Sequence, residues 1–400
     1  CSIRITFTPQ TTGSLSGFVS ATSGSNTAQA TLSGVGQAPA SLSFTQPSTT
    51  FFTIVAGQTS TQNFTLVNDG DVASGVVSFG FTGTGASSYS IQSSTCSGNS
   101  VPAHGSCTGV ILYSPAASGT HTATLTASAM PGGPAVYSIT GSAISPAALT
   151  LVAASGSNAN YGNVLLNTTQ TMSFTVTNTG QQSSGALSLG LSGANAAQWQ
   201  VSSGATACQI GQPLAGGQSC TSAVRFSAAA ANGNGSKTAT LTASATPGSS
   251  PSLTLTANVQ NPATLFAAIT SRDYAGQEVG VASPAFTWTI QNTGDLPTSV
   301  PTFTNTNASE FVVSNNTCGV AIAAGGSCSM NVAFTPSAGG VRNGTLTLTA
   351  ATGGSVSLTA TGRGQWRLSI VASFSGGTVS TTDNRLQNCG TTPCSALYDD

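Results

Sequence analysis

The chain has 400 residues, and only 4% of them are charged, with eight Lys and Arg against nine Asp and Glu. Ordinary globular domains carry about 25% charged residues, so the weak field of this surface argues against nucleic acid or anionic lipid as partners. Weak self-repulsion favours self-association or association with neighbouring surface proteins. No apolar run approaches the roughly 18 residues of a membrane-spanning helix.

Residues 1–37 are predicted to be the C-terminal part of an immunoglobulin-like domain. Segments 13–22 and 28–36 alternate polar and apolar residues, which is typical of half-buried antiparallel strands. The opening CSIRITFTP matches CSMNVAFTP at 328–336, which places Cys1 in register with Cys328. We therefore expect Cys1 to be unpaired within this chain and to pair upstream in a longer protein. A lipidated N-terminal cysteine is the competing interpretation.

Residues 38–143 are predicted to form the first complete unit. Strands are expected at 40–44, 51–55 and 59–67, with Phe64 and Leu66 on one face. The following Asn68-Asp69-Gly70 is predicted to be a turn, since these residue types favour positive φ. A strand at 76–81, a cysteine loop at 96–107 and closing strands at 120–128 and 135–140 complete the unit.

Residues 144–260 and 261–364 repeat this order, with turns at 178–180 and 292–294. The period of about 110 residues matches an immunoglobulin-like sandwich of about 100 residues and exceeds a solenoid repeat. The sequence therefore predicts an all-β rod of tandem sandwiches with one disulfide per domain. Residues 365–400 lack the repeat's motifs and are predicted to be the incomplete start of a different β-repeat module.

Recurring aromatic residues predict the core of each unit. One follows the second cysteine by six positions. Another precedes the first cysteine, and we expect this second set to plug the core beside the disulfide. These residues are Tyr113, Phe226 and Phe334, and Tyr89, Trp199 and Phe311. Phe64, Phe174 and Phe286 are expected to be buried as a further repeated set.

Eight of the nine cysteines form close pairs, predicted to be disulfides that tie the final strands of each domain: Cys96 with Cys107, Cys208 with Cys220, Cys318 with Cys328, and Cys389 with Cys394. Zinc is the competing interpretation, but zinc sites usually use CxxC or Cys/His clusters, and the chain has only two histidines. Disulfides persist in oxidising compartments, so a secreted or cell-surface protein is expected.

The pattern N-[TD]-G, aromatic, C-x9–11-S-C, x5-[FY]-x-P and a final T-L-containing strand resembles the Hydin-type, or choice-of-anchor D, immunoglobulin-like repeats of bacterial surface proteins. The likeness covers residues 1 to about 364. Residues 376–398, from GGTVS to NCGTTPCSALY, resemble the start of a divergent internalin-type B repeat. These resemblances imply stalk or interaction modules with no catalytic motif.

Isolated polar residues are the remaining candidates for a catalytic or metal-binding site. His104 lies near Ser106 but replaces a glycine of the other copies, and His121 is expected at an exposed strand position. Asp69 and Asp71 suggest calcium only weakly, and a polar turn is the simpler interpretation.

The remaining candidates are single residues. Glu310 and Asp273 are expected to be solvated surface charges. The six N-x-[ST] sequons, Asn63 and Asn343 among them, are expected by chance in this composition. No catalytic, cofactor-binding or metal-ligating residue is predicted.

The sequence therefore predicts a non-enzymatic extracellular structural protein, a stalk or filament segment of a longer bacterial surface protein. An adhesin or carbohydrate-binding repeat array, with glycan as partner, is the first alternative. Accessory modules of an exported enzyme are the second.

Overall fold

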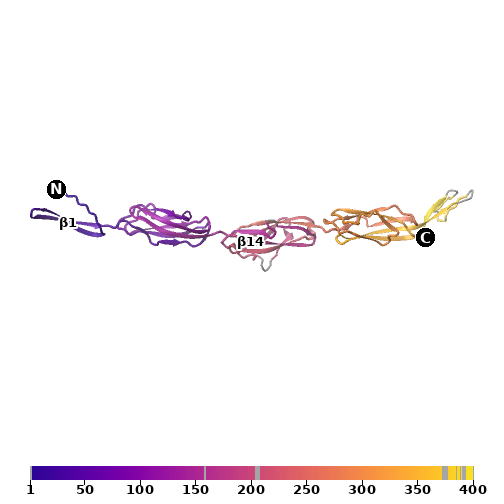
Figure 1. Cartoon of the computed structure of the whole chain (residues 1–400), viewed down its shortest axis with the longest axis horizontal. Helices are drawn as coiled ribbons and strands as arrows, with labels where there is room; N and C mark the ends of the chain where they lie inside the picture. Colours follow the sequence, from indigo (N-terminus) through magenta and orange to yellow (C-terminus); the bar gives the residue numbers. More distant parts are fainter. Residues whose placement is uncertain are drawn as a thin grey trace.

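The computed structural model describes residues 2–156, 159–202, 208–371, 377–383, 385–387, 389 and 393–399. Three β-sandwiches follow one another in a row, with the two chain termini at opposite ends (Figure 1). The only helical segments among the described residues are three single 3-10 turns, η1 (Ala86–Ser88), η2 (Ala196–Gln198) and η3 (Ala230–Asn232). The prediction of tandem all-β sandwiches in an elongated arrangement is confirmed.

The first sandwich, here domain 1, consists of two sheets. One has the strand order β3 (Leu42–Phe44), β6 (Ser60–Asn68), β9 (Ser106–Tyr113), β8 (Tyr89–Ser94). The other has the order β4 (Ser48–Thr50), β11 (Gly133–Ile144), β10 (Gly119–Ala129), β7 (Ser78–Thr82), and β5 (Ile54–Val55) also pairs with β11.

Domains 2 and 3 repeat this order. In domain 2 the sheets are β12 (Leu149–Ala153), β14 (Thr169–Asn178), β17 (Ser219–Ser227), β16 (Trp199–Ser202), and β13 (Ala159–Leu165), β19 (Ser252–Gln260), β18 (Gly235–Ser244), β15 (Ser188–Ser192). In domain 3 they are β20 (Leu265–Phe266), β22 (Phe286–Asn292), β25 (Ser327–Phe334), β24 (Phe311–Ser314), and β21 (Ser271–Glu278), β27 (Gly354–Ile370), β26 (Gly340–Ala350), β23 (Thr302–Asn305).

This arrangement agrees with the two-sheet plan of immunoglobulin domains. The first strand of each domain is split between the sheets, and its second part runs parallel to the last strand, as β13 does beside β19 and β21 beside β27. The two ends of each domain are therefore hydrogen-bonded to each other through parallel strands that leave the domain at opposite poles.

The apolar residues of the alternating strands fill each core, as the sequence predicts. Phe64, Leu66 and Phe174 are buried. The prediction for Phe286 is wrong, because this ring is only half-buried and Trp288, two residues later, takes the buried position beside the repeated turn. The repeat register counted back from Asn292 identifies Trp288 as the equivalent of Phe64.

The predicted aromatic pairs are buried in contact, with ring centroids 4.9 Å apart for Phe311 and Phe334. The predicted place of Phe311 and its equivalents beside the disulfide is wrong, because Phe311 pairs with Phe334. In β25, Cys328 stands near the start and Phe334 at the end, so about 20 Å of strand separates them. A third ring, Tyr274 from β21, completes the plug at this pole.

The chain ends carry further strands. β1 (Gly13–Ser23) and β2 (Asn26–Gly36) form a hairpin, and Phe7 lies over Gly34 as Phe334 lies over Gly362. At the other end, the last residues of β27 pair with β28 (Cys394–Tyr398), so one strand serves both domain 3 and the following module. Cys1 lies outside the described residues.

Candidate functional site: the linker lock

Each domain holds its incoming linker through three positions of one turn, which we call the linker lock. The lock follows the second core strand and comprises a buried asparagine, a glycine two residues later and a polar residue after the glycine. Its members are Asn68, Gly70 and Asp71 in domain 1, Asn178, Gly180 and Gln181 in domain 2, and Asn292, Gly294 and Asp295 in domain 3.

The asparagine is at most 1% exposed in all three domains and is fully hydrogen-bonded. In domain 3, Asn292 Oδ1 accepts from the backbone N–H groups of Thr264 at 3.0 Å and Gly294 at 3.1 Å. Its Nδ2 donates to the carbonyl oxygens of Leu296, Ile322 and Ala323. One side chain therefore joins the first strand, the turn and the cysteine loop, and its burial is possible because its polar atoms are paired.

The glycine is required for close approach and not for backbone conformation. The sequence-based expectation of positive φ is wrong here, because none of these three glycines has a positive φ. A Cβ on Gly294 would instead meet the carbonyl oxygen of the linker residue Pro262, and Gly180 faces Pro146 in the same way. The absence of a side chain lets the linker lie directly on the turn.

The third residue closes the lock on the linker backbone. Asp71 Oδ2 accepts from Ala38 N at 2.7 Å, and Asp295 Oδ2 accepts from Asn261 N at 2.7 Å. Gln181 Oε1 accepts from Ser145 N at 3.0 Å. In the reverse direction, the backbone N–H of each third residue donates to the linker carbonyl, completing a two-way clamp.

The two carboxylates are electrostatically suited to this position. The Ala38 N–H lowers the pKa of Asp71 against the opposing effect of burial, and His104 adds to the lowering. A hydrogen bond from Asn234, followed by the Asn261 N–H, lowers the pKa of Asp295. Both groups therefore stay ionised at neutral pH and act as permanent acceptors for the linker.

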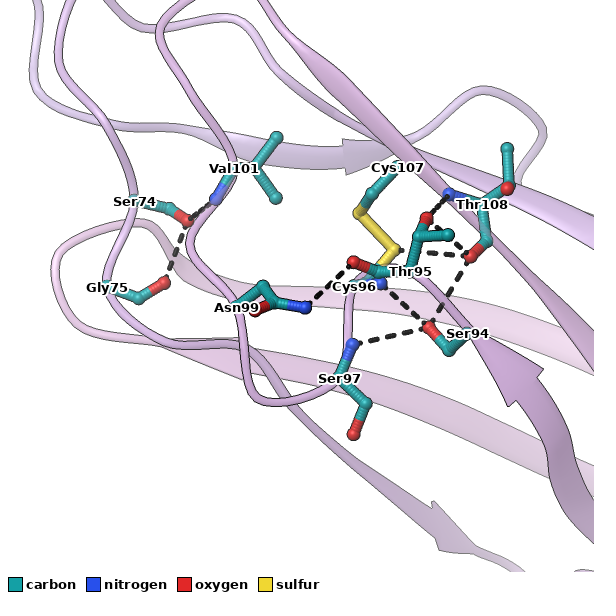
Figure 2. Close-up of a disulfide and its surroundings, with 10 residues drawn as sticks. All are labelled: Ser74, Gly75, Ser94, Thr95, Cys96, Ser97, Asn99, Val101, Cys107 and Thr108. Atoms are coloured by element: carbon teal, nitrogen blue, oxygen red, sulfur yellow. Dashed lines mark hydrogen bonds between the residues drawn. A yellow bond between two sulfur atoms is a disulfide. The ribbon is translucent and has the colours of Figure 1, made fainter.

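The cysteine loop is attached to the same pole of the domain. In domain 1 the Ser74 hydroxyl accepts from Val101 N at 2.9 Å and donates to the carbonyl oxygen of Gly75, beside the Cys96–Cys107 disulfide (Figure 2). Ser184 and Thr298 accept from Leu214 N and Ile322 N at the same 2.9 Å. The cysteine loop therefore supports the turn that binds the linker.

Disulfides join Cys96 to Cys107, Cys208 to Cys220, Cys318 to Cys328 and Cys389 to Cys394, with Cα–Cα separations of 5.2, 5.0, 5.0 and 5.6 Å. The expectation that they tie the final strands is wrong. Each domain disulfide closes the connection between neighbouring strands of the first sheet, β8 and β9 in domain 1, and leaves the last two strands free of it.

His104 belongs to the surface of the lock. It has a positive φ of 54°, matching Gly217 and Gly325 in the other copies, as its glycine-equivalent position predicts. Its Nε2 lies 3.0 Å from Asp71 Oδ1, so the structure brings together two residues that the sequence does not connect. Asp69 accepts from the Ser43 hydroxyl at 2.9 Å, in keeping with a polar turn.

The prediction for His121 is wrong, because the ring is half-buried and its Nδ1 lies 2.8 Å from the Tyr113 hydroxyl. Its equivalent Lys237 is only 8% exposed. The strand register places both positions beside the aromatic plug: His121 pairs with Gly141, against which Tyr113 packs.

The prediction for Glu310 as a solvated charge is also wrong. Its side chain is 6% exposed and accepts from the Ser337 N–H and hydroxyl and from Asn307 Nδ2, while Arg342 Nε lies 3.6 Å away. Burial alone raises the pKa of Glu310, but these hydrogen bonds and the Arg342 charge outweigh it and lower the pKa. Asp273 is exposed and caps its own turn through Ala275 N.

Within the described residues, no group of three or more His, Cys, Asp or Glu side chains could hold a metal ion. The part of the chain that the structure covers also contains no helix with the length and apolarity to span a bilayer.

No protein-family model and no curated protein matches the chain. Among solved structures, a segment of three immunoglobulin domains of titin is 11% identical, covering 82% of this chain and 99% of that one, with a TM-score of 0.35. The extracellular cadherin domains 1–4 of Protocadherin Gamma B7 are 12% identical over 84% and 80%, with a TM-score of 0.49. The PapD-like domain 7 of human CEP192 is 16% identical over 26% and 85%, with a TM-score of 0.20.

Proposed function

We propose that this chain is a non-enzymatic, extracellular stalk segment that holds two parts of a longer surface protein apart. The observation that supports this best is the linker lock, because it occurs three times at the pole where each domain meets its linker. Binding pockets seldom consist of side chains whose polar atoms are already paired within the protein. A spacer, in contrast, needs its linkers fixed and its surface inert.

The proposal includes the domain limits at 37/38, 143/144, 260/261 and 364/365. It also includes membership of the Hydin-type repeats and a bacterial origin, which rest on the sequence motifs. The internalin-type B repeat is proposed for the residues after 365. The disulfides and the polar, weakly charged surface support an extracellular setting.

Small-angle scattering of the purified chain tests the spacer role. The expected pair-distance distribution is that of a rod, with a cross-section of one sandwich and a long tail. A compact, roughly symmetrical distribution would contradict the proposal, because domains folded back on one another cannot separate two ends.

One observation favours the adhesin alternative. Met130 and Val76 are 93 and 64% exposed and line the same surface pocket of domain 1, which gives this domain an exposed apolar site. A glycan array with the intact chain decides between the roles. Submillimolar binding that is lost on Met130→Ser would favour the adhesin, and an array without hits supports the spacer.

A further inference from the structure

We propose that, of the three joints that follow domain 1, the first bends most, at the backbone between Ile144 and Ser145, and that domains 2 and 3 with the strands beyond residue 365 move as one stiff arm. This inference rests on the proposed stalk function and concerns where the stalk is flexible. It follows from comparing these three joints: the first two share the linker lock, and all three differ in what reaches across them.

Domain 2 has a longer loop at its outgoing pole. Lys237 is eleven positions after Phe226, whereas His121 is eight positions after Tyr113 and Arg342 eight after Phe334. The strand register makes these residues equivalent, so the three additional residues fall in the loop around η3. Asn234 is at the end of this loop, next to the start of β18.

Asn234 crosses the joint to domain 3. Its Nδ2 donates to Asp295 Oδ2 at 3.0 Å, and the same oxygen accepts from the linker N–H of Asn261. One carboxylate oxygen therefore connects domain 2, the linker and domain 3. A hydrogen bond to a charged acceptor is stronger than a neutral one, and this bond opposes bending because it joins domain 2 directly to domain 3 beside the linker.

At the joint between domains 1 and 2, the residues that the structure describes form no such brace. Gln181 and Gln182 bond to Ser145 and Ala147, so the linker is fixed to domain 2 alone. Among the described residues, no hydrogen bond or ion pair connects residues 38–143 with residues 147–260. Rotation about the backbone just before the lock therefore breaks no hydrogen bond or ion pair between the described residues of the two domains.

The joint after domain 3 is stiffened differently. β27 continues without a break, and its residues Trp366 to Ile370 pair with β28. The Arg367 guanidinium donates three hydrogen bonds, of 2.9, 2.9 and 2.6 Å, to the carboxylate of Glu278 at the end of β21. Arg363 Nε lies 2.6 Å from Asp399. A forked Arg–carboxylate pair fixes orientation as well as distance, and so adds to the stiffness of the shared strand.

Pulsed electron–electron double resonance on the intact chain measures the distribution of distances across each joint. Spin labels carried by non-canonical amino acids leave the disulfides untouched. Exposed sites flank the joints: Phe52 and Ile210 for domains 1 and 2, Leu165 and Val300 for domains 2 and 3, and Val341 and Val371 for the last joint. We expect the 52/210 distance distribution to be at least twofold wider than the other two.

Two substitutions assign the stiffness to the braces. Asn234→Ala should widen the 165/300 distribution at least twofold without changing 52/210, and Arg367→Gln should widen 341/371. Gln181→Ala, at the lock position equivalent to Asp295, and Arg225→Gln, on the surface of domain 2, are the controls and should leave both distributions unchanged.

Equal widths at all three joints, or no response to Asn234→Ala, would overturn the inference. A rod-like scattering profile together with equal widths would leave the stalk proposal standing and remove only the hinge. A compact profile would remove the stalk proposal itself.

Discussion

The side-chain nitrogen of Asn178 donates a hydrogen bond to the carbonyl oxygen of Leu214, 3.0 Å away. Leu214 belongs to the cysteine loop, whereas the oxygen of the same asparagine accepts from the N–H of Ala148, just after the linker. A single amide therefore couples the entry of the chain into domain 2 to the loop closed by the disulfide.

Replacing Asn178 with Leu should destabilise domain 2 by about 3 kcal/mol or more, because several buried backbone groups lose their partner at about 1–3 kcal/mol each. Trp199 lies in the core of domain 2 and Trp288 in the core of domain 3, so each reports on the unfolding of its domain in an intact chain whose other two tryptophans are replaced by Phe. Asn163→Ala is the control, since Asn163 is exposed, and its effect should stay within about 0.5 kcal/mol. Similar stabilities for both variants would show that the asparagine network contributes little.

Gly294→Ala should displace the linker before domain 3. An added Cβ would overlap the Pro262 carbonyl oxygen, and backbone cannot move away as a flexible side chain can. We expect faster hydrogen exchange at residues 261–265 and lower stability of domain 3, followed by Trp288 fluorescence. Gly319→Ala is the matched control, because a Cβ there meets nothing within 4 Å. Unchanged exchange in 261–265 would contradict the close-approach role of the glycine.

Reduction of the disulfides should lower the melting temperature while the sandwiches persist. Each domain disulfide closes a loop with a sequence separation of 10 to 12 residues, which contributes about 3 kcal/mol in the chain-entropy model. The disulfides lie outside the last strands, and the cores are held by other contacts. Circular dichroism should therefore retain its β signal after reduction, and complete loss of that signal at room temperature would refute this account.

Acid should selectively weaken domain 3 through Glu310. The folded-state pKa of this carboxyl is lowered from its ordinary value of 4.5, so ionised Glu310 favours the folded state above that pH. This contribution is lost as the pH falls from about 4.5 through the folded-state pKa. Glu310→Gln should reduce stability at pH 7 and flatten the acid limb of the Trp288 unfolding profile. If Glu310→Gln left the loss of stability at acid pH unchanged, a group other than Glu310 would be responsible for that loss.

Much of the fold followed from the sequence because alternation and repetition carry it. The strand around Phe64 and Leu66 is visible from its pattern, and the cysteine spacing gave the period of the domains. The site was harder to predict, because the lock depends on segments that meet only in three dimensions. Asn292 suggested a turn, but its burial depends on the cysteine loop.

The prediction that Glu310 is a solvated surface charge fails for the same reason, since its partners Ser337 and Arg342 are distant in sequence. Two signals could have found more of the site. A proline-containing linker precedes each N-x-G turn by about 30 residues, and the loop holding Asn234 is three residues longer than its counterparts.

The most direct test of the stalk is to stretch single molecules of the intact chain between its ends. Parallel pairs such as β13 and β19 join the two ends of each domain, so force loads their hydrogen bonds together and each sandwich should resist and then open in one step. The account predicts three main unfolding steps. A reductant opens each disulfide and frees its loop of roughly 11 residues, so the extension gained in each step should increase by about 40 Å. Extension without discrete steps, or steps unaffected by reductant, would contradict it.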